Sequence, residues 1–169
     1  MNEIVQMGKK VLREKAEYIE PSEIASEKIQ NIIEKMHKIL ATQNDGVAIA
    51  APQIGESYRI FTIAPFLFDH PKEAHLVYIN PEIIETSKKT KWLHEGCLSC
   101  RWKVGDVERH TEATVTAYDE HGNKFTESGD KLLAHIFQHE IDHLDGILFI
   151  DKAQKLRDMT QEEIDEVVK

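Results

Sequence analysis

The stretch DKLLAHIFQHEIDHLDG, residues 130–146, decides the fold of this chain. Asp130 is of a residue type that caps helix N-termini, and Gly146 suits the turn that ends a helix. Between them, apolar side chains recur at the three- and four-residue spacing of an α-helix, which predicts one long helix with a single packing surface. The residues of this surface are Leu132, Leu133, Ile136, Phe137, Ile141 and Leu144.

The same stretch contains His139-Glu140-Ile141-Asp142-His143, the strongest chemical signal in the sequence. Helix positions i and i+4 lie ~40° apart in rotation and one turn apart in rise, so both imidazoles can reach one divalent ion. Glu140 is rotated ~100° from His139, near enough to touch a water on the ion without ligating it. A solvated helix face that happens to carry these residues is the alternative. His135 also lies four residues before His139, but Ile136 follows it where a Glu would be needed, so this pair ranks lower.

A second helix is predicted nearer the N-terminus. Pro21-Ser22 opens it, with Ser22 as the N-cap, and Asn44-Asp45-Gly46 ends it. Its apolar positions recur at helical spacing and comprise Ala25, Ile29, Ile32, Ile33, Met36, Ile39 and Leu40.

Between the two helices, strand-like runs cover residues 58–63, 76–79 and 113–117. A hairpin loop is predicted over residues 119–123, and the last ten residues predict a short acidic helix. The sum is an α+β fold, in which mainly antiparallel sheets pack around a central long helix that carries the HExxH motif, with a further helix near the N-terminus.

Length and composition narrow the functional classes. With 169 residues the chain suits one domain over residues 1–169, since domains commonly have ~100–200 residues. A net charge of -9 argues against electrostatic binding to nucleic acid or to an anionic membrane. No apolar run approaches the ~18 residues of a spanning helix, and the N-terminus lacks signal-peptide features. With only two cysteines and no unexplained apolar stripe, we expect a cytoplasmic monomer.

Two imidazoles leave a metal ion short of ligands, so a third ligand must come from elsewhere. A metzincin arrangement is excluded, because Phe149 occupies the third ligand position. Glu162 or Glu163, ~20 residues after the motif, would give a thermolysin-like metallopeptidase. Cys97 could serve alone and leave one position for water, or act with Cys100 to close a structural Cys2His2 zinc site. The C-x-x-C pair could instead have redox chemistry or be two buried apolar cysteines.

Three sequence blocks together point to one family. Glu95-Gly96-Cys97-Leu98-Ser99, with Gly46–Gln53 upstream and His139–Gly146 downstream, resembles the signatures of peptide deformylase. The blocks occur in order and at familiar separations, and the likeness extends from the first helix to about Asp151. Three separated blocks are far more specific than any one of them.

The resemblance implies a role for each matching residue. Glu140 would take a proton from water and deliver it to the leaving amine. The Gln53 side-chain amide and the backbone N–H of Leu98 would stabilise the oxyanion. The ion would be one divalent metal, Fe(II) as the native ion, or Zn(II), Ni(II) or Co(II) in its place. Its ligands would be Cys97, His139 and His143.

The implied reaction removes the formyl group from formyl-methionyl nascent peptides at the ribosome and releases formate. An extended peptide would pair with the strand edge at Val47–Ile49, beside an apolar methionine pocket. Glu95 and Asp142 would hydrogen-bond the imidazole N–H groups. The substrate-binding residues would be Gly46, Val47, Ala48, Gly96, Leu132 and His135.

Four positions depart from the family pattern. Ala48 stands where a second glycine is usual, Val104 where many bacterial members carry arginine, and His135 where the residue is usually apolar. Cys100-Arg101-Trp102 replaces an aliphatic residue followed by proline. These changes touch the substrate walls, so a relative that prefers a different side chain or an acidic neighbour is the alternative function. Oxidation that joins Cys97 to Cys100 is a further alternative.

Overall fold

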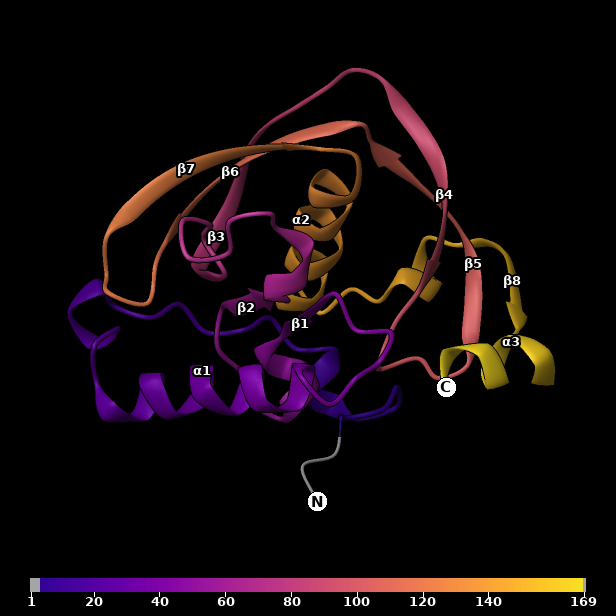
Figure 1. Cartoon of the computed structure of the whole chain (residues 1–169), viewed down its shortest axis with the longest axis horizontal. Helices are drawn as coiled ribbons and strands as arrows, with labels where there is room; N and C mark the ends of the chain where they lie inside the picture. Colours follow the sequence, from indigo (N-terminus) through magenta and orange to yellow (C-terminus); the bar gives the residue numbers. More distant parts are fainter. Residues whose placement is uncertain (1–3, 169) are drawn as a thin grey trace.

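Two antiparallel sheets and three α-helices make up the fold in the computed structural model, which describes residues 4–168 (Figure 1). The larger sheet has the strand order β1-β2-β3-β6-β7, with β1 Ala48–Ala50, β2 Ile60–Ile63, β3 Val77–Thr86, β6 Glu112–Tyr118 and β7 Lys124–Asp130. The smaller sheet has the order β4-β5-β8, with β4 Thr90–Gly96, β5 Lys103–His110 and β8 Gln154–Asp158. Neighbouring strands in both sheets pair antiparallel, which confirms the predicted α+β class.

Helix α2, Lys131–Leu144, carries the HEIDH residues and packs its apolar side against the larger sheet. Phe137 meets the ring of Tyr78 from β3, with centroids 5.4 Å apart, and Tyr78 stacks on Phe61 from β2 at 4.5 Å. Leu132 does not belong to this packing surface as predicted, because it is 47% exposed and faces a cleft instead. Asp130 occupies the N-cap position, but its side chain makes no capping hydrogen bond.

Helix α1, Glu27–Leu40, begins later than the sequence predicted. Its N-cap is Ser26, whose hydroxyl accepts the N–H of Ile29 at 3.4 Å, so the assignment of Ser22 as the cap is wrong. The reason is that Pro21–Glu23 forms a separate 3-10 turn, closed by an Ile24 N–H to Pro21 C=O bond. The apolar face of α1 then packs on strands of the larger sheet.

The predicted strands match β2, the beginning of β3 and the middle of β6, but β3 continues to Thr86. The predicted hairpin loop joins β6 to β7, where the Asp119 carboxylate accepts the N–H groups of His121 and Asn123. The predicted C-terminal helix is α3, Gln161–Val167. In Figure 1 the smaller sheet and α3 lie to one side of α2, and α1 lies along the bottom of the molecule. Within residues 4–168, no helix combines the length and apolar character that crossing a bilayer requires.

The end of α2 is fixed by a glycine and by the segment that precedes α1. Gly146 has φ +75°, and a Cβ added there would lie 2.5 Å from the carbonyl oxygen of Arg13. The Leu144 carbonyl accepts the N–H of Ala16 at 2.8 Å, so the N-terminal segment runs directly over the helix end. This close approach holds the last turn of α2, and with it His143, against the N-terminal segment.

Gly146→Ala should therefore destabilise the protein by about 3 kcal/mol, because it adds a backbone clash to the cost of a left-handed conformation. Gly122→Ala is the matched control: Gly122 has φ +84°, but the nearest atom to its added Cβ is 3.7 Å away. The control should lose only about 1 kcal/mol. Urea denaturation of both variants measures the difference, and equal losses would show that the contact with Arg13 contributes nothing.

Candidate functional site

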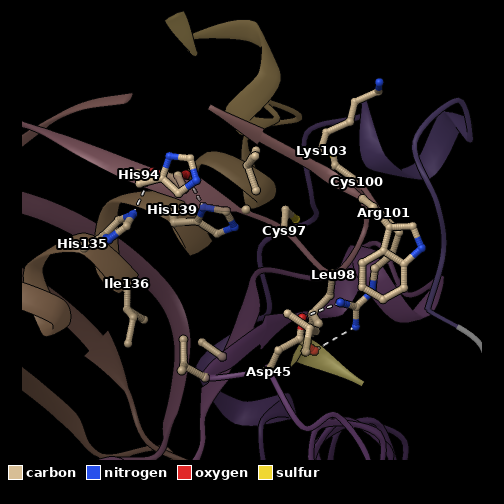
Figure 2. Close-up of a pocket in the computed structure, with 18 of the residues that line it drawn as sticks. Asp45, His94, Cys97, Leu98, Cys100, Arg101, Lys103, His135, Ile136 and His139 are labelled. Carbon is tan, nitrogen blue, oxygen red and sulfur yellow. Dashed lines mark hydrogen bonds and ion pairs between the residues drawn. The ribbon is translucent and has the colours of Figure 1, made fainter. Parts of the chain in front are cut away.

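A cleft of about 280 Å³ separates the two sheets and is bounded on a third side by α2. Strand β1 is the edge of the larger sheet and β4 is the edge of the smaller one, and both line the cleft. Figure 2 shows Cys97 and His139 close together within it, with Asp45 and Arg101 at another part of its wall. The three sequence blocks that were singled out therefore meet in one place.

Three candidate metal ligands converge at this cleft. The Sγ of Cys97 and one ring nitrogen each of His139 and His143 all lie within 4.8 Å of one another. Cys97 directly follows β4, and the two histidines occupy positions i and i+4 of α2, which sets their ring centroids 4.9 Å apart. The Nε2 of His143 lies 3.2 Å from the Cys97 Sγ.

A buried carboxylate orients His139. Glu95 of β4 accepts the Nδ1–H of His139 at 2.5 Å on Oε1 and the Nε2–H of His135 at 2.7 Å on Oε2. This uses Nδ1 of His139 and leaves its Nε2 to ligate a metal ion. Glu95 was predicted to act in this way, and the contact is present.

Arg109 of β5 completes the network and was not foreseen from the sequence. Its guanidinium donates to both oxygens of Glu95, from Nη2 at 2.8 Å and from Nε at 3.1 Å, and both side chains are buried. Burial opposes ionisation of Glu95, but the bonds from His135, His139 and Arg109 outweigh it and hold the pKa of this carboxyl well below its usual range. Glu95 is thus a charged acceptor.

Asp142 does not bind an imidazole as predicted. Its carboxylate accepts Arg109 Nη1 at 2.6 Å and Lys152 Nζ at 2.8 Å. The reason is its place on α2: three residues beyond His139, it faces the guanidinium rather than either ring. Asp142 therefore belongs to the same network through its bond with Arg109.

Glu140 lies beside the ligands, buried and without any protein hydrogen bond to its Oε2 among the described residues. Burial raises the pKa of its carboxyl to about 7. Burial also lowers the pKa of His143, which favours the neutral imidazole that binds metals. A carboxyl with this pKa can exchange a proton near neutral pH.

Gln53 is held in one orientation by the backbone. Its Oε1 accepts the N–H of Ala50 at 2.8 Å, so its amide nitrogen points the other way, 3.6 Å from the Cys97 Sγ and 3.1 Å from the Ser99 hydroxyl. Leu98 follows Cys97, and its carbonyl accepts the amide of Gln6 at 2.9 Å. Both predicted oxyanion donors therefore lie on segments fixed next to the cysteine.

The residues present fit a divalent metal ion. A thiol and two imidazoles form a donor set suited to iron, zinc, nickel or cobalt. A further polar atom beside the cluster, Glu140 Oε2, and the Nδ1 of the ligand candidate His143 are both buried without a partner in the described chain. Burial of such atoms is costly unless something pairs with them, which an ion with its water would do for Glu140.

The other proposed ligand sets do not form. Cys100 is fully buried with Leu12 and Phe149 in an apolar cluster against which Cys97 packs, but the ligand group that forms among the described residues is Cys97, His139 and His143, without Cys100. Glu163 pairs instead with Arg157, at 2.7 and 2.8 Å. A second donor group does exist, Glu95 with His135 and His139, but Arg109 already binds both of its carboxylate oxygens.

All six predicted substrate-contacting residues line the cleft: Gly46, Val47, Ala48, Gly96, Leu132 and His135. A Cβ at Gly46 would lie 2.9 Å from the Gln43 Cβ, which explains a glycine there. Arg101 also lines the cleft, but Asp45 binds its guanidinium through both oxygens. Met159 and Val167, near the C-terminal end, line the same cleft, and no sequence pattern predicts this.

Comparison with known proteins gives a consistent result. The family model for polypeptide deformylase matches residues 1–159. Peptide deformylase 2 of Nostoc sp. is 39% identical over 170 residues, covering 98% of this chain and 93% of that protein. Peptide deformylase 1A, chloroplastic/mitochondrial, of Arabidopsis thaliana is 41% identical over 163 residues, covering 89% of this chain. The chain spans 60% of the length of the Arabidopsis protein.

Solved structures agree with this. A peptide deformylase from Synechococcus elongatus in complex with actinonin superposes with a TM-score of 0.82 at 32% identity, covering 98% of this chain and 85% of that one. A peptide deformylase from Legionella pneumophila gives a TM-score of 0.80 at 36% identity, covering 92% and 87%.

The buried network makes a prediction about stability. Arg109→Met should cost about 3–5 kcal/mol, because it leaves the Glu95 charge buried without its main partner. The double variant Arg109→Met/Glu95→Gln should recover part of that loss, since the charge is then gone. Lys152→Met is the control: its side chain is 42% exposed, and it should cost under about 1 kcal/mol. Urea denaturation in the presence of a chelator measures all three, and a double variant no more stable than Arg109→Met would contradict the coupling.

Proposed function

The chain belongs to the peptide deformylase family, and we propose that it hydrolyses the N-terminal formyl group of formyl-methionyl nascent peptides, releasing formate and a free amino terminus. The observation that carries the proposal is the convergence of Cys97, His139 and His143 beside the buried carboxyl of Glu140. The reaction needs an activated water, a proton carrier and donors for the oxyanion. Each has a candidate in this cleft.

Cys97, His139 and His143 would hold one divalent ion, with Fe(II) as the proposed native metal and Zn(II), Ni(II) or Co(II) as substitutes. Such an ion acts as a Lewis acid and makes a hydroxide nucleophile available near neutral pH. The Glu95 carboxylate keeps the His139 ring in the tautomer and orientation that ligation needs. Arg109 keeps that carboxylate charged and in place.

Glu140 would act as general base and then as general acid. With a pKa of about 7, its carboxylate accepts a proton from the attacking water and passes it to the amine nitrogen as the C–N bond breaks. Glu140 directly follows His139, so its carboxyl lies beside the three proposed metal ligands and is not one of them. Burial keeps bulk water from competing for the proton.

Gln53 and Leu98 would stabilise the negative charge that develops on the formyl oxygen. The amide N–H of Gln53 is already oriented by the Ala50 bond, so it needs no rearrangement when the charge appears. The backbone N–H of Leu98, directly after Cys97, is the second proposed donor. Donors of this kind are typically worth ~10²–10³ in turnover each.

The substrate would lie extended between the two sheet edges. Its main chain can pair with β1 on one side and with the Gly96 end of β4 on the other. The methionine side chain would enter the part of the cleft lined by Val47, Leu132 and His135. Because formyl-methionyl substrates are nascent chains, we also propose that this protein acts at the ribosome. We further propose that it does so as a monomer.

Metal content separates this proposal from its alternatives. Cys97→Ser and His143→Ala should lose the bound ion, because each removes one of three protein ligands. Cys100→Ser and Glu163→Gln are the controls and should keep it, since neither residue joins the cluster. Elemental analysis of anaerobically purified protein gives the result. Loss of metal in Cys100→Ser would favour the closed structural site, and loss in Glu163→Gln the metallopeptidase.

Turnover tests the chemistry directly. Protein loaded with Fe(II) should release formate from formyl-Met-Ala-Ser, and Glu140→Gln should lower kcat by ~10²–10⁴ because the proton carrier is gone. The variant should retain its metal, which is the control. Full activity in Glu140→Gln would refute the role of Glu140, and no release by metal-bearing wild-type protein would refute the proposed reaction.

A further inference from the structure

We propose that helix α3, with the turn before it, forms an outer wall of the substrate cleft and contacts apolar side chains of the peptide downstream of its formylated methionine. This inference rests on the proposed function and adds a specificity element to it. Val167 of α3 and Met159 before it line the same cleft as Cys97 and Glu140. The match to the family model ends at residue 159, just before α3 begins.

The strand pairing explains how the C-terminal end reaches the cleft. Strand β5 pairs with β4 through Val104 and Gly96, and with β8 through Val104 and Arg157. Val104 is buried and lines the cleft, so a chain that leaves β8 continues along the cleft rim. Figure 1 shows α3 beside the lower ends of β5 and β8.

Several contacts hold α3 in this place. The N–H of Met159 donates to the Trp102 carbonyl at 2.8 Å, which joins the start of the turn to the loop after Cys97. Arg157 binds Glu163 through two hydrogen bonds of 2.7 and 2.8 Å, and Glu163 also accepts the Thr160 N–H at 2.7 Å. The segment is therefore fixed at its first turn.

The helix turns one side toward the molecule. Glu163, Ile164 and Val167 are half-buried and recur at three- and four-residue spacing, whereas Val168 is 55% exposed. Val167 is thus the residue of the last turn that faces the cleft, and its neighbour Val168 faces solvent. This difference supplies a matched pair for mutation.

The surface that this wall offers to a peptide is mainly apolar, because the cationic side chains of Lys103 and Arg101 already pair with carboxylates. Lys103 binds Asp158 at 2.7 Å, and Arg101 is bound by Asp45 while its guanidinium lies over the Trp102 ring, 4.7 Å from the centroid. Trp102, Val104, Met159 and Val167 remain as the surface that a peptide side chain can contact. An apolar side chain gains from such a surface, and an acidic one finds no free cation among these residues.

The test compares short and long peptides on three variants. For wild-type protein, kcat/KM should be higher with formyl-Met-Ala-Ala-Leu than with formyl-Met-Ala-Ala-Glu. Val167→Asp should lower kcat/KM for formyl-Met-Ala-Ala-Leu about tenfold, mainly through KM, and lower that for formyl-Met-Ala less than about twofold. Val168→Asp, which adds the same charge one residue further on, should leave the long-to-short ratio at the wild-type value. Glu163→Gln, which loosens the first turn of α3, should shift the ratio in the same direction as Val167→Asp.

Calorimetric binding of the unformylated peptides Met-Ala and Met-Ala-Ala-Leu provides a readout that does not depend on turnover. The ratio of their Kd values should change in Val167→Asp and not in Val168→Asp. An unchanged ratio in Val167→Asp, or an equal change in both variants, would overturn the role of α3. Absence of formate release by wild-type protein would instead overturn the proposed reaction, while the binding ratio would still decide the inference about α3.

Discussion

The site depends on one buried ion pair, between Glu95 of β4 and Arg109 of β5. Glu95 receives hydrogen bonds from Arg109, His135 and His139, so a single carboxylate joins the smaller sheet to helix α2. A carboxylate removed from water is costly unless its lone pairs are satisfied, and here each oxygen accepts two bonds. The relative position of Cys97 and the histidines follows, because Cys97 is two residues beyond Glu95 on the same segment.

The two sheets supply different parts of the site. The larger sheet supplies the core on which α2 packs through Phe137 and Tyr78, and this packing fixes the helix that carries both histidines and Glu140. The smaller sheet supplies Cys97 and the Glu95–Arg109 pair. The cleft exists because the edges of these sheets face one another without pairing, so its opposite walls belong to different layers of the fold.

Much of this arrangement was predictable from the sequence where the signal is local. The spacing of His139 and His143 is a property of any helix, and the hairpin at Asp119 is specified by its own side chain. Cys97 could be chosen over Cys100 and Glu163 only by family resemblance, because ligands from different elements have no sequence spacing that geometry fixes. The role of Arg109 was not predictable, because one arginine in the polar pattern of β5 resembles an exposed residue. The position of Val167 in the cleft wall was not predictable either, because a short acidic helix resembles a fully solvated one. Ser22 shows that a capping residue type does not by itself locate a cap, and Asp130 shows that a residue can occupy the N-cap position without a side-chain capping bond.

The facing sheet edges have a consequence for timing. A β-strand edge without a partner normally invites other chains to add to it, which proteins avoid by covering or interrupting such edges. Here the edge strands β1 and β4 line a cleft of about 280 Å³ instead, where an extended segment could pair with them. Under the proposed function, a polypeptide that pairs with these edges must have its first residues extended and free of other secondary structure. The proposed reaction would then compete with the folding of the substrate, and it would favour chains whose N-terminus is bound before it becomes buried.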